Sequence, residues 1–200
     1  MPATELAALL AYTTAMAFTP GPNTTLSTAM AANHGLAHAM RFVLAVPFGW
    51  CLLLVACAAG LGTLVTTVPA LAAGIRVAGA VYMLWLAWRL ANTRAMAHAR
   101  NAQGLDVGFA RGVALQFVNA KAWLNALTIA ATWIAVDGQV AARLAWVLPI
   151  AAAYGFASNF TYAALGAALR RWLAHGTRLA WFNRAMAAVL AATALWMLGS

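Results

Sequence analysis

The chain has 200 residues, of which 65% are hydrophobic and only 8% are charged, with three acidic and twelve basic side chains. A water-soluble domain needs charge on about a quarter of its residues to cover its surface, so the composition excludes an ordinary soluble globule. The net charge of +9 does not indicate a nucleic-acid binder, because uncharged stretches separate the arginines instead of gathering them on one solvated face. The composition predicts an all-α integral membrane protein.

Apolar runs that are long enough to cross a bilayer core of about 30 Å recur between charges and turn signals. In chain order we expect six transmembrane helices, over 6–32, from 42 to a turn at 60–69, from that turn to 89, and over 109–136, 142–169 and 179–198. The first run is too long for a signal peptide and has no basic region before it. The polar stretch 92–108 separates two three-helix halves at 1–91 and 109–200.

The arginines are distributed unequally between the predicted loops. Nine lie in or beside the first, third and fifth loops, and two lie in the second and fourth. Since Lys and Arg favour the cytoplasmic side, this asymmetry predicts a cytoplasmic 92–108 loop and both termini on the extracytoplasmic side. The two halves then have opposite topology, and the spacing of Gly49 and Gly60 recurs in Gly155 and Gly166. We therefore expect two inverted repeats, a signature of secondary transporters.

The first predicted helix contains Pro20, Gly21 and Pro22, which cannot continue a regular helix because proline lacks an N–H and clashes with the preceding turn. At 1.5 Å per residue, Gly21 lies roughly 18 Å from the end of this run, deep in the hydrocarbon. Broken backbone is tolerated there only if it is buried in protein or lines a wet cavity. Asn23 and Thr24 open the second half-helix. We expect residues 20–24 to bind a zwitterion, with a simple packing kink as the alternative.

The fourth predicted helix carries Lys121, the only lysine of the chain. It lies roughly 15 Å from Arg111, and a base at the bilayer centre costs about 3 kcal/mol, so we expect it to face a cavity. Because burial disfavours the charged form of a lysine, Lys121 is also the candidate proton-coupling residue. Its expected polar companions are Tyr82, Gln116, Asn119, Asn125, Ser158 and Asn159.

The other chemically reactive residues indicate no second site. Cys51 and Cys57 share one apolar run without a His or acid at metal-ligand spacing. The four histidines fall in predicted loops, where we expect solvated surface. No nucleophile with a base and no carboxylate lies within the predicted helices. We therefore expect neither an enzyme nor a bound metal or cofactor.

Three segments resemble landmarks of the LysE/RhtB family of amino-acid exporters: TPGPN at 19–23, GAVYMLWLAWR at 79–89 and ALQFVNAK at 114–121. Length, predicted spans and the central polar loop agree, so the resemblance covers nearly the whole chain. Most of the family has Asn-Pro-Lys in the fourth helix, whereas this chain has Ala120 in place of the proline, which leaves open whether that helix breaks. Segment 115–121 and His34-Gly35 most resemble the branch that exports cysteine and O-acetylserine.

The resemblance implies a bacterial inner-membrane transporter that exports a small neutral amino acid or derivative, similar to cysteine and O-acetylserine or to threonine and homoserine, by proton antiport. Its partners would be the substrate, protons and the lipid bilayer. We expect no nucleic-acid partner, and the sequence leaves open whether the protein forms a homo-oligomer. We expect the substrate carboxylate to pair with Lys121, and its ammonium to meet the Asn23 amide and carbonyls freed near Pro20 and Gly21. The alternatives are a non-transporting membrane scaffold, or an exporter of another small solute such as a basic amino acid or metal ion.

Overall fold

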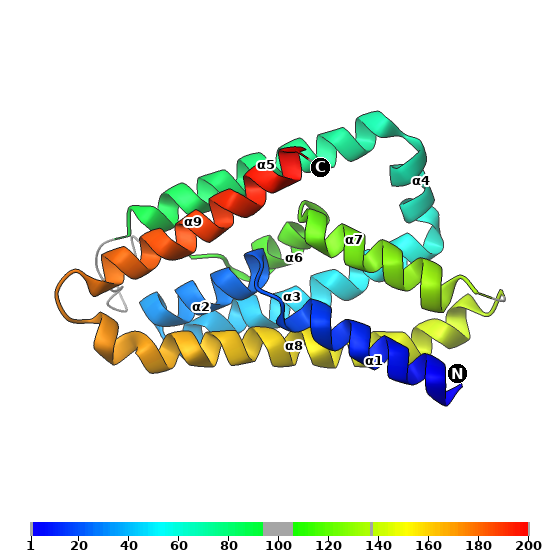
Figure 1. The fold of residues 1–200 in the computed structure, drawn as a ribbon, viewed down its shortest axis with the longest axis horizontal. Helices are drawn as coiled ribbons and strands as arrows, with labels where there is room; N and C mark the ends of the chain where they lie inside the picture. The colour runs from blue at the N-terminus through cyan, green and yellow to red at the C-terminus, as the bar shows by residue number, and fades with distance from the viewer. Residues whose placement is uncertain (1, 94–105, 137, 200) are drawn as a thin grey trace.

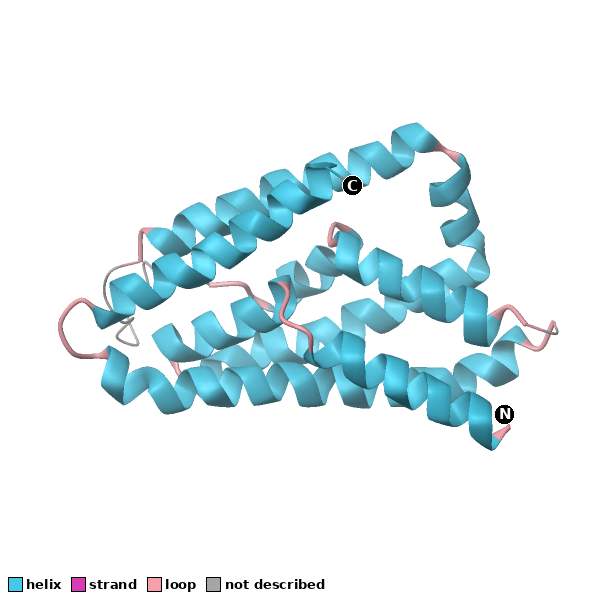
Figure 2. Cartoon of the chain, in the orientation of Figure 1, coloured by secondary structure: helices cyan, strands magenta, loops and turns pink. Residues whose placement is uncertain are grey.

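A computed structural model describes residues 2–93, 106–136 and 138–199, and every regular element in these ranges is helical (Figure 2). The helices run back and forth along the long axis of the molecule (Figure 1). In chain order the elements are α1 (Ala3–Phe18), α2 (Pro22–His34), α3 (Leu36–Ala56), the π-helical η1 (Cys57–Leu61), α4 (Gly62–Thr67), α5 (Pro69–Ala91), α6 (Phe109–Phe117), α7 (Ala120–Ile129), the π-helical η2 (Ala130–Ile134), α8 (Val140–Leu173) and α9 (Arg178–Gly199).

Four helical segments are long and apolar enough to cross a membrane: Leu36–Thr67, Pro69–Ala91, Val140–Leu173 and Arg178–Gly199. The expectation of an all-α membrane protein is therefore confirmed. The first and fourth predicted spans are each divided, into α1 with α2 and into α6 with α7 and η2. Helix α8 is longer than the predicted 142–169 because its last turn continues into two arginines, whose long side chains can reach an interface from beyond the apolar segment.

The connections gather at two ends of the molecule (Figure 1). The turn at Gly35, the end of α5 and the α8–α9 turn lie at one end, and the first and fifth predicted loops, both rich in arginine or histidine, belong to it. The N-terminus, the α4–α5 turn at Val68 and the α7–α8 connection lie at the other end. Residues 94–105 of the predicted cytoplasmic loop, with Arg94, His98 and Arg100, lie outside the described residues, as does Asp137.

The break between α1 and α2 follows from local backbone chemistry. Pro20 offers no N–H to extend α1, and Gly21 is fully extended at φ −172° and ψ −174°. Pro22 then begins α2 at the first helical position, where the missing N–H costs nothing. Thr24 closes the new helix end, because the Gly21 N–H donates to its Oγ1 at 2.9 Å. The predicted break is present at the predicted residues.

A second break separates α6 from α7 at Val118 and Asn119, although no proline is present. Asn119 adopts an extended conformation and caps α7, because its Oδ1 accepts the Lys121 N–H at 3.1 Å. The indole N–H of Trp123 donates to the Phe117 carbonyl at 2.8 Å and satisfies the end of α6. The question that Ala120 left open is thus answered: the fourth predicted span breaks beside Lys121.

Close helix contacts hold these elements together. Helix α2 packs along α8, α5 along α9, and α3 along both α6 and α8. At the α2–α8 crossing, a Cβ on Gly166 would lie 2.2 Å from the Thr28 carbonyl oxygen, so only glycine allows this approach. Small residues at such crossings are typical of helix packing in membranes.

Two apolar clusters lie on either side of the helix breaks. One joins α2, α3, α5, α6, α8 and α9 around Leu26, Phe42, Leu86 and Leu115. The other joins α1, α3, α7, η2 and α8 around Leu9, Leu53, Ile129 and Val147. Along α8 the polar residues described below fall between the two clusters. The packing therefore places a polar site near mid-length of the molecule.

Candidate functional site

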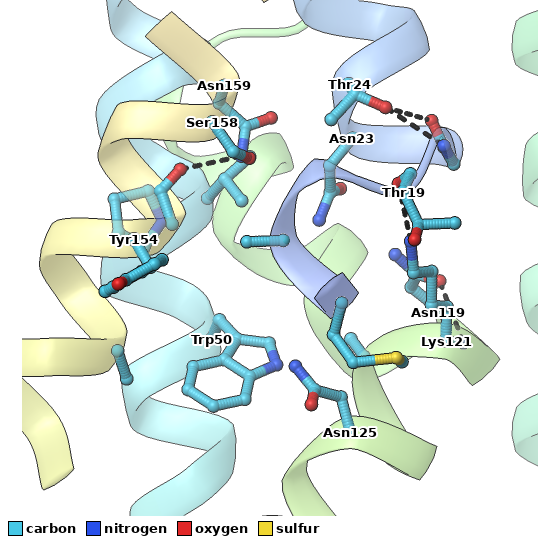
Figure 3. A pocket seen from close by; sticks show the side chains of 18 of the residues that line it. Thr19, Asn23, Thr24, Trp50, Asn119, Lys121, Asn125, Tyr154, Ser158 and Asn159 are labelled. Carbon is cyan, nitrogen blue, oxygen red and sulfur yellow. Dashed lines mark hydrogen bonds between the residues drawn. The ribbon is translucent and has the colours of Figure 1, made fainter. Parts of the chain in front are cut away.

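A cavity lies between the two helix breaks, with walls from α1, α2, α3, α7 and α8 (Figure 3). Its empty volume, counted out to the open mouth and including open solvent, is about 650 Å³. The wall mixes apolar surface with side-chain amides and hydroxyls. Its residues are Thr13, Met16, Ala17, Thr19, Gly21, Pro22, Asn23, Thr24, Val46, Pro47, Trp50, Asn119, Lys121, Ala122, Asn125, Ala151, Tyr154, Gly155, Ser158 and Asn159.

Lys121 joins the two breaks. Its backbone N–H is held by the cap of Asn119, and its Nζ donates to the Thr19 carbonyl at 2.7 Å. A Cβ on Gly21 would lie 3.2 Å from Lys121 Cδ and 3.3 Å from Nζ, so the glycine leaves the space that the lysine side chain occupies. Lys121 is half-buried and is the one Asp, Glu, Lys or Arg side chain in the cavity wall as far as the structure describes it. The wall therefore presents a single positive group beside broken backbone.

The end of α1 contributes carbonyl oxygens to the site. Pro20 has no N–H for the Met16 carbonyl, and the Gly21 N–H bonds to Thr24 instead of to the Ala17 carbonyl. Both carbonyls thus lose their partners within the helix, and both residues line the cavity. The next carbonyl, of Phe18, accepts the Tyr162 hydroxyl at 2.9 Å. Unpaired helix-end carbonyls are suited to bind an ammonium group.

Asn23 is tied to α6 instead of pointing freely into the cavity. Its Nδ2 donates to Gln116 Oε1 at 2.8 Å, and Gln116 Nε2 donates back to Asn23 Oδ1 at 3.1 Å. The Gln116 amide also donates to the Gly112 carbonyl. Gln116 is completely buried and lies behind the wall, so it orients Asn23 and is not itself a lining residue.

The wall formed by α8 is polar and internally bonded. Asn159 donates to the Gly155 carbonyl at 2.8 Å and accepts the Ser27 hydroxyl at 2.9 Å, which links α8 to α2. Ser158 and Tyr154 lie on the same side of the cavity (Figure 3). Residues 154 and 158 are one turn apart and so share a helix face.

Most residues predicted from the sequence come together here. Gly21, Pro22, Asn23, Thr24, Asn119, Lys121 and Asn159 line the cavity, as do the companions Asn125 and Ser158. Pro20 shapes the break without lining the wall, and Gln116 acts through Asn23. Their part in binding stays a prediction.

Tyr82 is the exception among the predicted residues, because it does not line this cavity. It lies in a separate groove between α5 and α6 with Trp85, Arg111 and Leu115. Its ring stacks on Trp85 with 5.6 Å between centroids. Helix α5 packs mainly along α9, which holds this face of α5 away from the cavity.

Sequence reasoning missed Thr13, Met16, Trp50 and Tyr154. Thr13 was detectable as a polar residue within the first apolar run, one turn before Ala17. Trp50 and Tyr154 gave no signal, since large aromatics in apolar helices usually pack or anchor at interfaces. Only the crossing of α3 and α8 beside the breaks brings them to the site.

Comparisons with known proteins agree with this architecture. The LysE type translocator family matches residues 14–199. The chain is 31% identical over 187 residues to the cysteine/O-acetylserine efflux protein of Klebsiella pneumoniae, covering 93% of this chain and 94% of the relative. It is 32% identical over 173 residues to the protein of the same name in Salmonella typhimurium, covering 85% of this chain and 86% of the relative. It is 30% identical over 171 residues to the one in Escherichia coli K12, covering 86% of this chain and 87% of the relative. No solved structure matches the chain.

The family match covers nearly the whole chain, from within α1 to the end of α9. Together with the enterobacterial relatives, the long apolar helices indicate a multi-pass protein of the bacterial inner membrane. The resemblance inferred from the three sequence segments is confirmed. The chain belongs to the LysE type translocator family.

Proposed function

We propose that this protein exports a small neutral amino acid or amino-acid derivative from the cytoplasm in exchange for protons. The relatives are named as efflux proteins for cysteine and O-acetylserine, which supports amino-acid export as the activity of this chain. The observation that carries the proposal is Lys121, whose Nζ lies 2.7 Å from the Thr19 carbonyl in a cavity between two broken helices. Broken helices around a site at mid-length are a recurrent design of secondary transporters.

The zwitterion has a complementary partner for each of its charges. Its carboxylate pairs with Nζ of Lys121, next to the N-terminus of α7, whose positive dipole end favours an anion. Its ammonium takes the carbonyls of Met16, Ala17 and Thr19 at the end of α1. The ammonium thereby replaces Lys121 at the Thr19 carbonyl.

Charge balance in the cavity provides a coupling route. A bound zwitterion adds no net charge, so a protonated Lys121 leaves the occupied site at +1, which is costly in surroundings of low dielectric. Release of that proton to the cytoplasm neutralises the loaded site, and the neutral amine can still donate to the carboxylate. After the substrate leaves outward, Lys121 takes a proton from the outside and returns. One proton then enters for each zwitterion exported.

The charge of the wall favours a neutral substrate over a basic one. A lysine or arginine substrate would bring a second cation beside Lys121, and the lining residues contain no Asp or Glu to compensate for it. In the part of the chain that the structure describes, no cluster of His, Cys, Asp or Glu is suited to a metal ion. A scaffold without transport activity would have no need of a polar cavity at this depth.

We further propose that residues 1–91 and 109–200 are inverted repeats, with both termini and the α4–α5 turn outside and the 92–108 loop inside. Each half begins with a helix broken beside a lining asparagine, Asn23 or Asn119, and ends with a helix that packs on its counterpart, α5 on α9. Single cysteines at Gly104 and Ser200, in a background without Cys51 and Cys57, test the orientation. An impermeant maleimide added to intact cells is expected to label only position 200, and labelling of 104 alone would reverse the topology.

Transport itself is tested in proteoliposomes loaded with one radiolabelled amino acid at a time, in a series of cysteine, O-acetylserine, threonine, homoserine, leucine, lysine and arginine. External acidification is expected to accelerate efflux of a small neutral substrate, and a protonophore is expected to remove the acceleration. Because one positive charge enters per cycle, an inside-negative potential should also accelerate efflux. Absence of protein-dependent efflux across the whole series would favour the scaffold, and efflux of only basic amino acids would refute the charge argument.

A further inference from the structure

The cavity wall between α1 and α7 contains two side-chain oxygens that are buried without a hydrogen-bond partner, Oγ1 of Thr13 and Oδ1 of Asn125. Thr13 is only 6% exposed. Most other amides and hydroxyls around the cavity are paired, as in the Asn23–Gln116 and Ser27–Asn159 contacts. Buried polar atoms are nearly always satisfied, so these two unpaired oxygens indicate a partner that the protein itself does not supply.

Both residues face the space next to Lys121. Asn125 follows Lys121 by one helical turn, about 6 Å along the axis of α7 and on the same face. Thr13 lies on the face of α1 that also presents Met16 and Ala17 to the cavity. In Figure 3, Asn125 lies opposite Trp50 at one end of the cavity, Thr24 and Asn159 lie at the other, and Lys121 lies between them.

We propose that Thr13 and Asn125 form the subsite for the substrate's side chain, and that this subsite selects small amino acids with a side-chain hydroxyl or thiol. The inference rests on the proposed function, in which Lys121 holds the carboxylate one turn away. Oδ1 of Asn125 only accepts hydrogen bonds, whereas the Thr13 hydroxyl can accept or donate, so a group that satisfies both oxygens must carry a donor proton. Hydroxyl and thiol groups on a short side chain meet this requirement, whereas a methyl group of the same size does not.

The physical basis of selection is the cost of leaving the oxygens unpaired. An apolar substrate fits the same volume but leaves the oxygens of Thr13 and Asn125 without a hydrogen bond. A site that is built to bond a hydroxyl therefore discriminates strongly against a substrate of the same shape without the hydroxyl. This discrimination is stronger than the one an apolar pocket shows against a substrate that lacks a methylene. Selectivity comes from the unpaired wall, and it is separate from the carboxylate contact that all amino acids share.

Two pairs of nearly isosteric amino acids test the proposal: threonine against valine, and cysteine against 2-aminobutyrate. The ratio of maximal export rate to half-saturation concentration is measured for each in proteoliposomes. The wild-type protein is expected to favour the hydroxyl or thiol member about tenfold. In Thr13→Val and Asn125→Leu, which keep shape and remove the polar oxygen, the preference should fall to within about twofold. The loss should come from weaker export of the polar member and stronger export of the apolar member.

Thr14→Val is the matched control, because Thr14 is the next residue of α1, is exposed, and bonds its own helix at the Leu10 carbonyl. This variant should keep the wild-type preference. If Thr13→Val and Asn125→Leu keep the wild-type preference for the hydroxyl or thiol member, the proposed subsite is wrong. It is also wrong if a correctly inserted variant loses export of both members of a pair equally. Lys121→Met separates this proposal from the proposed function. If Lys121→Met exports all four amino acids at the wild-type rate, the proposed carboxylate contact is wrong, whatever Thr13→Val and Asn125→Leu show.

Discussion

The two helix breaks that flank the cavity reach similar geometry by different means. Between α1 and α2, Pro20 and Pro22 remove backbone donors, so the segment itself ends the helix. Between α6 and α7 the break relies on neighbours: the Asn119 cap, the Trp123 bond to the Phe117 carbonyl, and Gly79 of α5 against the Val118 carbonyl. The first break is therefore set by its prolines, and the second combines a local cap with the close packing of α5.

The difference teaches where each break is vulnerable. Substitutions on other helices should have little effect on the path of the first break, whereas a substitution at Gly21 should change what the break presents to Lys121. The second break should respond to substitutions on another helix, because α5 contributes to it. Lys121 belongs to both, since its backbone is held at the second break and its Nζ at the first.

The largest expected effect follows from removing that connection. Lys121→Met should reduce export roughly 10- to 100-fold, the range for loss of a hydrogen bond to a charged group. Lys121→Arg should bind substrate but lose acceleration by external acid, because arginine holds its proton. Arg76→Met, on α5 outside the cavity, is the control and should transport normally. Wild-type rates with normal acid dependence in Lys121→Met would mean that the lysine only fills space.

A methyl group on α5 should disturb the second break from a distance. In Gly79→Ala the added Cβ would lie 1.9 Å from the Val118 carbonyl oxygen, so backbone must move, at a cost of about 1–3 kcal/mol. Gly74→Ala on the same helix meets nothing within 4 Å and should stabilise by about 0.5–1 kcal/mol. Thermal unfolding in detergent should therefore shift in opposite directions for the two variants. Equal shifts would show that α5 does not support the break.

The first break can be probed without changing its path. Gly21→Ala places a Cβ 3.2 Å from Lys121 Cδ and 3.3 Å from its Nζ, so the flexible end of the lysine side chain must shift by a few tenths of an ångström. Because φ at Gly21 is extended, alanine adds no backbone strain. Export should fall a few-fold while the unfolding temperature hardly changes, and Gly21→Leu should abolish export. A large drop in stability for Gly21→Ala would instead identify the break as a packing element.

The smallest effects on stability should come from replacing the asparagine cap of the second break with a proline, the residue that makes the first break. Asn119→Ala removes the cap and should cost about 1 kcal/mol. Ala120→Pro should stabilise by about 0.4–1 kcal/mol, because Ala120 is the first residue of α7 and Asn119, at φ −99° and ψ 106°, already has the conformation that precedes proline. The double variant should return close to wild-type stability. Failure of Ala120→Pro to compensate would show that the cap is needed for more than ending α6.

The sequence by itself determined the membrane class, the first break and the one charged residue of the interior. Each of these follows from local chemistry: apolar run length, missing proline donors, and the cost of a lone lysine in hydrocarbon. From them, most of the cavity residues were predictable, and their roles in transport stay predictions.

Only the tertiary structure decided the second break, the pairing of Asn23 with Gln116, the exclusion of Tyr82 and the inclusion of Thr13 and Trp50. Each depends on which helices cross, as α5 does at Val118 and α3 and α8 do beside the breaks. Helix packing in a membrane is set by close contacts of small residues and by interhelical hydrogen bonds. Such contacts join residues far apart in the chain, and no local pattern encodes them.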